Sequence, residues 1–230
     1  MSICADVVLL LHLANKRQYA LMQLIVITPE QSIEGETDLV NQMFANSLQR
    51  LHIRKPQYSS RNYEDYIGAI PAHYHSRIVL HASFELFDEF GLGGVHLNSH
   101  FRNDKQIWDK LRHLPPAALS TSFHSWQEIM ENEFHFGYVF ISPVFDSISK
   151  SGYKGKIDLY GAEETKQQLL MAGGYCPPIF ALGGVGPKEI LALCKHGFDG
   201  AAVLGSIWMA NDPVAKFMEI ENAVRSLSDP

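Results

Sequence analysis

The sequence predicts one α/β domain folded as a single (β/α)8 barrel. From residue 22 onward, eight short apolar runs alternate with segments of helical periodicity. This alternation is typical of a parallel sheet whose two faces are covered by helices. Eight strands also match the number that closes such a barrel. An open, doubly wound sheet is the competing architecture, but it usually has fewer strands, and no G-x-G-x-x-G motif follows the first run.

The expected strands are rich in Val, Ile, Leu and Phe, as buried strands of a parallel sheet are. They cover residues 24–28, 50–54, 77–81, 93–98, 118–122, 138–142, 178–184 and 200–205. The clearest helical patterns cover residues 38–48, 104–114, 125–133, 162–173, 187–197 and 213–227. Ser125 is a candidate N-cap, and Pro187 and Pro213 lie near first turns. Gly197 is a candidate C-cap.

Residues 1–21 are expected to be an extension outside the barrel, which would then span residues 22–230. A short apolar stretch at residues 7–13 follows Asp6, whereas a secretory signal carries positive charge at that place. Met22 stands directly before the first expected strand. Translation from an upstream start codon is therefore a second explanation for the extension.

Composition narrows the classes of function. The chain is 46% hydrophobic and 19% charged, which suits one sizeable core. A formal net charge of −6 offers no basic footprint for nucleic acid, and no apolar run approaches the ~18–20 residues of a membrane span. The three cysteines, Cys4, Cys176 and Cys194, lack metal-site spacing, so we expect reduced thiols and a cytoplasmic location.

Histidines gather at the carboxyl ends of the expected strands, where barrels of this class carry their chemistry. They are His52, His81, His96, His100 and His124, with Asn98 and Ser122 close by in the sequence. Such a group could form a metal cluster. No Asp or Glu joins it, so we expect no metal ligands. A hydrogen-bonded structural role, or acid/base chemistry near neutral pH, is favoured instead.

Three further segments suit a phosphate group. Gly183-Gly184 follows the seventh strand and Gly205-Ser206 the eighth, and glycines there let backbone N–H groups approach an anion closely. The hydroxyls and ammonium of Ser147, Ser149 and Lys150 follow the sixth strand. The alternative for all three segments is a plain turn.

Arg54 ends the second strand and shares a face with His52. Its guanidinium fork suits phosphate oxygens, and a structural ion pair with a carboxylate is the alternative.

Six short segments of the sequence form a recognisable combination. They occur in order along nearly the whole chain after residue 22: LHIRK, GGVHLN, STSFHS, SPVFDSISK, ALGGV and AAVLGSIW. Together they resemble the thiamine phosphate synthase / TenI family of small (β/α)8 barrels. Synthases of this family join hydroxymethylpyrimidine diphosphate to thiazole phosphate and release pyrophosphate, using Mg²⁺. TenI-type members include thiazole tautomerases, which aromatise thiazole phosphate by proton transfer.

The resemblance implies roles for several of these residues. The thiazole phosphate cradle corresponds to Gly183, Gly184, Gly205 and Ser206. The pyrophosphate grip corresponds to Ser147, Ser149 and Lys150. Arg54 matches the arginine of the family's R-x-K, but the lysine position holds Pro56, and Lys55 would point to the other face.

The magnesium site of the synthases is not matched. Their Asn-Asp after strand three corresponds here to His81-Ala82, and their G-Q-x-D after strand four corresponds to residues 98–101, Asn-Ser-His-Phe. Mg²⁺ prefers oxygen ligands, so the missing aspartates argue against a synthase. Asp104 is a nearby carboxylate that a shifted loop could bring in.

The segment SFHS, residues 122–125, resembles the S-x-H-S of the tautomerases, whose histidine is the proposed acid/base. The resemblance therefore implies His124 as the catalytic residue, although synthases often have a histidine nearby. A thiazole phosphate tautomerase without a cofactor is slightly favoured. The alternatives are a Mg²⁺-dependent synthase that also binds hydroxymethylpyrimidine diphosphate, a non-catalytic thiazole phosphate binder, and an unrelated sugar-phosphate isomerase or epimerase.

Overall fold

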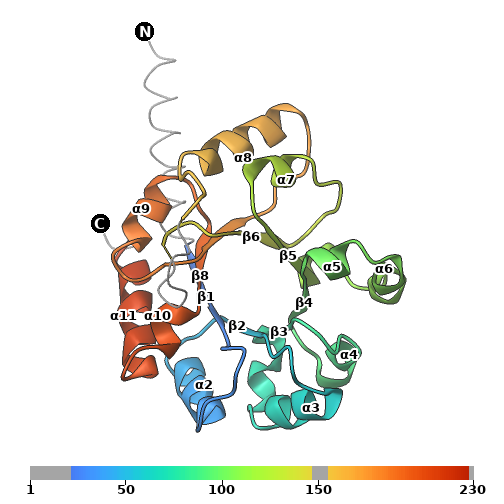
Figure 1. Ribbon diagram of the computed structural model, residues 1–230, viewed down its shortest axis with the longest axis vertical. Coiled ribbons are helices and arrows are strands. Elements are labelled where there is room, and N and C mark those ends of the chain that lie inside the picture. Colours follow the sequence, from blue (N-terminus) through green and yellow to red (C-terminus); the bar gives the residue numbers. More distant parts are fainter. Residues whose placement is uncertain (1–21, 147–154, 228–230) are drawn as a thin grey trace.

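Eight parallel strands close into a barrel in which each strand pairs with its neighbours along the chain (Figure 1). The computed structural model describes residues 22–146 and 155–227. The strands are β1 Gln23–Ile27, β2 Arg50–Ile53, β3 Ile78–Leu80, β4 Gly94–Leu97, β5 Leu119–Phe123, β6 Tyr138–Ile141, β7 Ile179–Leu182 and β8 Gly200–Val203. Pairing of β1 with β8 closes the sheet. The predicted (β/α)8 barrel is confirmed, and each predicted strand overlaps an observed one.

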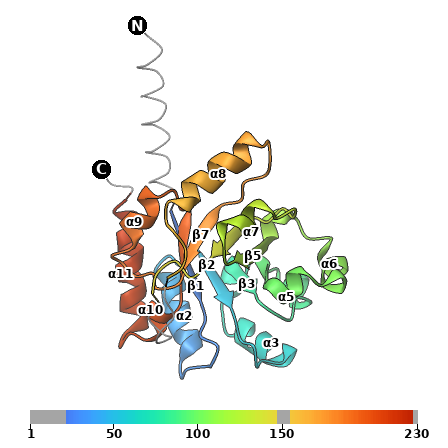
Figure 2. The same ribbon diagram turned by 45° about the horizontal axis from the view of Figure 1, so that its top comes forward.

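Helices surround the barrel (Figure 1), and the turned view of Figure 2 shows α9 and α11 beside each other on its outer side. None of the helices in the described ranges combines the length and apolarity needed to cross a bilayer. The helices are α2 Glu36–Ala45, α3 Ser60–Gly68, α4 Leu86–Phe90, α5 Ser99–Arg102, α6 Lys105–Leu111, α7 Trp126–Met130, α8 Gly161–Met171, α9 Ile190–Lys195, α10 Gly205–Trp208 and α11 Pro213–Arg225, with 3-10 turns Ala72–Arg77 and Pro116–Ala118.

The helix ends follow the signals in the sequence. The Ser125 side chain accepts a hydrogen bond from the Glu128 N–H and caps α7, as predicted. Pro213 takes the first turn of α11, which Asp212 caps. Gly197 follows α9 with a φ of 85°, the left-handed conformation that glycine adopts without a steric penalty.

The core has two layers because successive strand residues face opposite sides of the sheet. The layer inside the barrel is formed by Ile25, Ile27, Tyr138, Phe140, Phe180 and Ala202. The alternate strand residues, such as Leu24, Val26 and Val139, pack outward against the helices in a much larger cluster. The barrel interior is thus filled with side chains, which leaves space for a site only at its ends.

A buried ion pair joins α2 to the chain just after β2. The Lys55 Nζ donates to Glu36 Oε2 at 2.7 Å, and the Tyr66 hydroxyl donates to Glu36 Oε1 at 2.8 Å. Lys55 and Glu36 are 1% and 4% exposed. Lys55 therefore points away from the barrel axis, as its place in the strand alternation predicts.

Candidate active site

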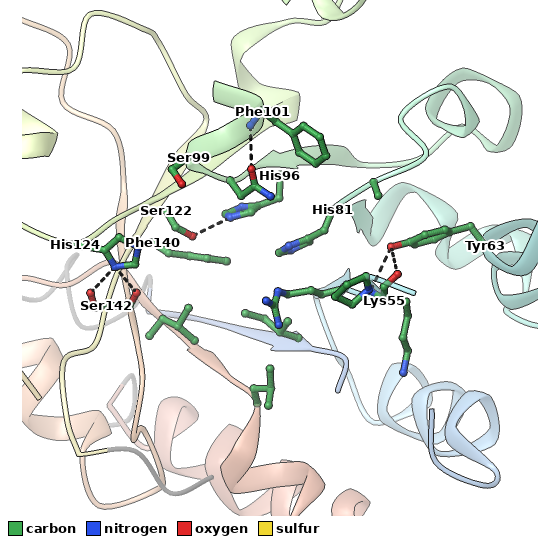
Figure 3. A pocket seen from close by; sticks show the side chains of 17 residues that line it. Lys55, Tyr63, His81, His96, Ser99, Phe101, Ser122, His124, Phe140 and Ser142 are labelled. Carbon is green, nitrogen blue, oxygen red and sulfur yellow. Dashed lines mark hydrogen bonds between the residues drawn. The ribbon is translucent and has the colours of Figure 1, made fainter. Parts of the chain in front are cut away.

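A cavity of about 580 Å³ opens at the carboxyl end of the barrel (Figure 3). Residues at or just after the ends of all eight strands line it, and this is the end at which barrels of this class carry their sites. Six candidates from the sequence meet in it: Arg54, His81, His96, Asn98, Ser122 and His124.

Three histidines from neighbouring strands meet at the inner end of the cavity. The His52 Nδ1 lies 2.9 Å from His81 Nε2, and the rings of His81 and His96 stack with their centroids 4.3 Å apart. His52 and His96 are 0% and 2% exposed. His81 and His96 reach the cavity, while His52 lies beneath them in contact with the core residue Phe140.

Burial keeps these histidines neutral. Burial is the largest cause that lowers the pKa of His52 and His81 well below the ordinary imidazole value. Repulsion that a protonated ring would meet from the neighbouring histidines, and from Arg50 at His52 or Arg54 at His81, lowers both further. Burial and the nearby guanidinium groups of Arg54 and Arg102 lower the pKa of His96 to about 3. None of the three is therefore charged at neutral pH.

Side chains from inside the barrel hold this cluster. The His52 Nε2 lies 2.6 Å from the Tyr138 hydroxyl, and the His96 nitrogens each lie 2.9 Å from a serine hydroxyl, Ser120 at Nδ1 and Ser122 at Nε2. Sequence reasoning missed Tyr138 and Ser120. The available signal was strand alternation, since polar side chains on the inward face of a barrel strand require buried partners.

His124 lies at the cavity edge beyond β5 with an exposed ring (Figure 3). Its backbone N–H donates to Glu128 Oε2 at 3.0 Å, which ties it to the first turn of α7. Its Nδ1 lies 3.0 Å from the backbone oxygen of Ser142. A carbonyl oxygen can only accept, so Nδ1 carries the hydrogen and Nε2 keeps its lone pair.

Two further polar candidates, Arg54 and Asn98, have structural partners. Arg54 lines the cavity mouth and forms an ion pair with Glu30, the alternative that the sequence left open. The Asn98 side chain caps α5 by accepting from the Phe101 N–H at 2.9 Å. His100 lies exposed on α5 beside Phe101 and is not among the described residues that line this cavity.

The cavity does not fit a magnesium ion held by carboxylates. Among the described residues that line it there is no Asp or Glu, and Ala82 and Ser99 lie along its wall. The Asp104 side chain accepts from the Gln106 N–H at 2.8 Å and caps α6 instead. Residues 147–154 contain no carboxylate either.

The glycine-bearing turns lie directly beside the cavity, because Leu182 and Leu204 line it and Gly183 and Gly205 follow them. The Ser206 Oγ, at the start of α10, is buried without a hydrogen-bond partner among the described residues. A buried hydroxyl without a partner is unusual in a native fold. A phosphate oxygen is a ligand group that would satisfy it.

Gly184→Ala is expected to destabilise the protein more than Gly35→Ala. The backbone φ is 67° at Gly184 and 68° at Gly35, so an alanine at either position costs about 1–2 kcal/mol of backbone strain. Only at Gly184 would the new Cβ lie 2.3 Å from the backbone oxygen of Asp146, whereas open space surrounds Gly35. Urea unfolding of both variants measures the difference, and equal losses would contradict the close packing of this turn.

The predicted pyrophosphate grip, Ser147, Ser149 and Lys150, lies outside the described residues. Asp146 and Gly155, the described residues on either side of this segment, are joined by a hydrogen bond from the Gly155 N–H to Asp146 Oδ1 at 2.8 Å. The role of this loop in binding an anion stays a prediction.

Comparisons with known proteins agree on one family. The model of the family described as thiamine monophosphate synthase (TMP-TENI) matches residues 24–207. Thiamine-phosphate synthase 1 of Streptococcus pneumoniae is 25% identical over 157 residues, which cover 68% of each chain. A thiamine-phosphate synthase of Desulfitobacterium hafniense is 25% identical over 171 residues, covering 72% of this chain and 78% of that one.

Two solved structures of thiamine phosphate pyrophosphorylases are similar to this barrel. A thiamine phosphate pyrophosphorylase from Bacteroides thetaiotaomicron superposes with a TM-score of 0.68 at 30% identity, covering 89% of this chain and 98% of that chain. A pyrophosphorylase from Pyrococcus furiosus has a TM-score of 0.70 at 18% identity, covering 94% and 98%, and supports the fold alone. On the matched residues 24–207 and their barrel, the chain belongs to the thiamine monophosphate synthase (TMP-TENI) family of enzymes.

Proposed function

We propose that this enzyme is a thiazole phosphate tautomerase of the thiamine pathway. The observation that carries the proposal is the placement of His124, whose Nδ1–H donates to the Ser142 carbonyl while Nε2 keeps a lone pair. An imidazole fixed in one tautomer can take a proton at Nε2 and return it, which is what a tautomerisation requires. The reaction needs no metal or redox cofactor. This is consistent with a cavity that has no Asp or Glu among the described residues lining it.

In this proposal the substrate phosphate binds at the turns after β7 and β8. The backbone N–H groups of Gly183, Gly184 and Gly205 and the unpartnered Ser206 hydroxyl supply the donors. The thiazole ring then extends into the cavity toward His124. Nε2 removes a proton from one atom of the ring system and delivers it to another, so bonds to hydrogen change while the composition of the substrate does not.

Synthase activity is the second candidate, and its support is the similarity to proteins named thiamine-phosphate synthases. It would require Arg54, the loop that contains Ser147, Ser149 and Lys150, and the cavity histidines to replace the charge of Mg²⁺ on a departing pyrophosphate. A non-catalytic thiazole phosphate binder is the third candidate. A cytoplasmic location remains our expectation for any of the three.

The test is a tautomerisation assay on the purified chain with the non-aromatic thiazole phosphate tautomer as substrate. Proton NMR follows the appearance of the aromatic product, with and without added Mg²⁺. We expect enzyme-dependent aromatisation at a rate that Mg²⁺ does not change. Binding of thiazole phosphate without any acceleration over the buffer rate would instead support the binder.

A further inference from the structure

The histidine trio at the inner end of the cavity consists of His52 on β2, His81 directly after β3 and His96 on β4. Each offers one ring nitrogen, and these three atoms lie within 4.8 Å of one another. Figure 3 shows His81 and His96 side by side in the cavity. The trio is separate from His124, which the proposed proton transfer uses.

The hydrogen bonds around His96 determine which of its nitrogens is free to bind. The Ser120 hydroxyl donates to the Val95 carbonyl at 3.3 Å, so Ser120 Oγ accepts from the His96 Nδ1–H at 2.9 Å. Nε2 therefore carries the lone pair and accepts from Ser122 at 2.9 Å. The Ser122 hydroxyl is a rotor that can turn aside without leaving another group unpaired.

His52 is held in a comparable way. Its Nε2 lies 2.6 Å from the Tyr138 hydroxyl, and its Nδ1 faces His81 Nε2 at 2.9 Å. If Nε2–H donates to the Tyr138 oxygen, Nδ1 presents a lone pair toward the other two rings. Histidines that bind metals usually have the second ring nitrogen hydrogen-bonded in this manner, because that bond fixes the tautomer and the ring orientation.

We propose that His52, His81 and His96 form a binding site for one first-row divalent transition-metal ion of the Zn²⁺ type. Neutral imidazole suits such ions, whereas Mg²⁺ and Ca²⁺ prefer oxygen. Three histidines without a carboxylate suffice for zinc, and a fourth coordination position then stays available for water or substrate. Since His81 and His96 line the cavity, that position would face the cavity.

The sequence favoured a hydrogen-bonded structural role or acid/base chemistry over metal binding, because no carboxylate accompanies these histidines. The structure adds three converging nitrogens and an outer layer of Tyr138 and Ser120 that holds two of the rings. The proposal concerns binding alone and does not depend on which reaction the enzyme catalyses.

The experiment uses the full chain, purified without a polyhistidine tag and stripped with a chelator. Titration with Co²⁺ is followed by its visible absorption, and Zn²⁺ affinity is measured by competition with a coloured chelator. We expect one ion per chain and the intense absorption of four-coordinate Co²⁺. His81→Gln is expected to abolish this absorption and to weaken Zn²⁺ binding more than the roughly 10–100-fold that follows loss of an outer partner.

Two variants make the result specific. His113→Gln removes an exposed histidine that pairs with Asp88 on the surface, and it is expected to leave metal binding unchanged. Ser120→Ala removes the outer partner of His96, together with the bonds of that hydroxyl to the Val95 carbonyl and to Tyr138, and is expected to weaken Zn²⁺ binding about 10–100-fold. It decides the question if His81→Gln does not fold. Wild-type binding no tighter than that of the folded His81→Gln or Ser120→Ala variant would overturn the proposal, and the trio would then be a hydrogen-bonded network only.

Discussion

Replacing His124 with glutamine is expected to lower the kcat of thiazole tautomerisation by about 10²–10⁴-fold, the usual contribution of a general acid/base. Glutamine keeps a side-chain amide near the Ser142 carbonyl but cannot carry a proton between two atoms of the substrate. The ring of His124 is exposed at the cavity edge, so the fold should tolerate the change. Steady-state kinetics on the folded variant measures the loss.

The ratio of kcat to KM effects distinguishes proton transfer from binding. The proposed phosphate donors lie on other turns, so KM should change little when His124 is replaced. His73→Gln changes an exposed histidine in the 3-10 turn Ala72–Arg77, which contacts Tyr74 and is not among the described residues that line the cavity. This variant is the matched control and should retain wild-type kcat. A kcat for His124→Gln equal to that of the control would remove His124 from the mechanism.

Replacing Lys55 with methionine is expected to lower the free energy of unfolding by about 3–5 kcal/mol, as breaking a buried ion pair usually does. Burial lowers the pKa of Lys55, and the hydrogen bond and charge of Glu36 raise it in part. The methionine variant leaves the Glu36 carboxylate buried with the Tyr66 hydroxyl and the Ile33 N–H as its partners. Urea unfolding measures the loss.

The double variant Lys55→Met with Glu36→Leu separates the cost of an unpaired charge from the loss of packing. Replacement of both charges by apolar groups is often close to neutral, so the double variant should recover most of the stability lost by Lys55→Met. Arg61→Ala, which removes an exposed surface pair with Glu64 and Asp65, should have little effect. A double variant that is no more stable than Lys55→Met would show that the charge on Glu36 is not the cause.

Much of the barrel could be predicted because its strands are apolar runs of the length typical of buried strands. Runs such as residues 138–142 and 200–205 are buried on both faces, and their periodicity does not depend on distant partners. The direction of Lys55 followed from alternation along β2. Its partner Glu36 could not be predicted, because the pairing depends on how α2 packs behind the barrel.

The site was predicted less completely than the fold. The strand ends placed His81, His96, Ser122 and His124 at one cavity, since the carboxyl ends of barrel strands meet there. His100 does not join that group because it lies in helix α5, one residue past the helix start, and not at the end of a strand. The contact between His52 and His81 depends on strand register and ring orientation, which no local pattern encodes.

The most direct test of the account is to mix the purified protein with hydroxymethylpyrimidine diphosphate and thiazole phosphate, with and without Mg²⁺, and to measure thiamine phosphate. The central claim is that the chain has kept the family barrel and phosphate turns while its cavity has no carboxylates, among the described lining residues, to hold Mg²⁺. The account predicts no thiamine phosphate under either condition, with tautomerisation retained by the same sample. Mg²⁺-dependent formation of thiamine phosphate would contradict it and make the chain a synthase with a rebuilt diphosphate site.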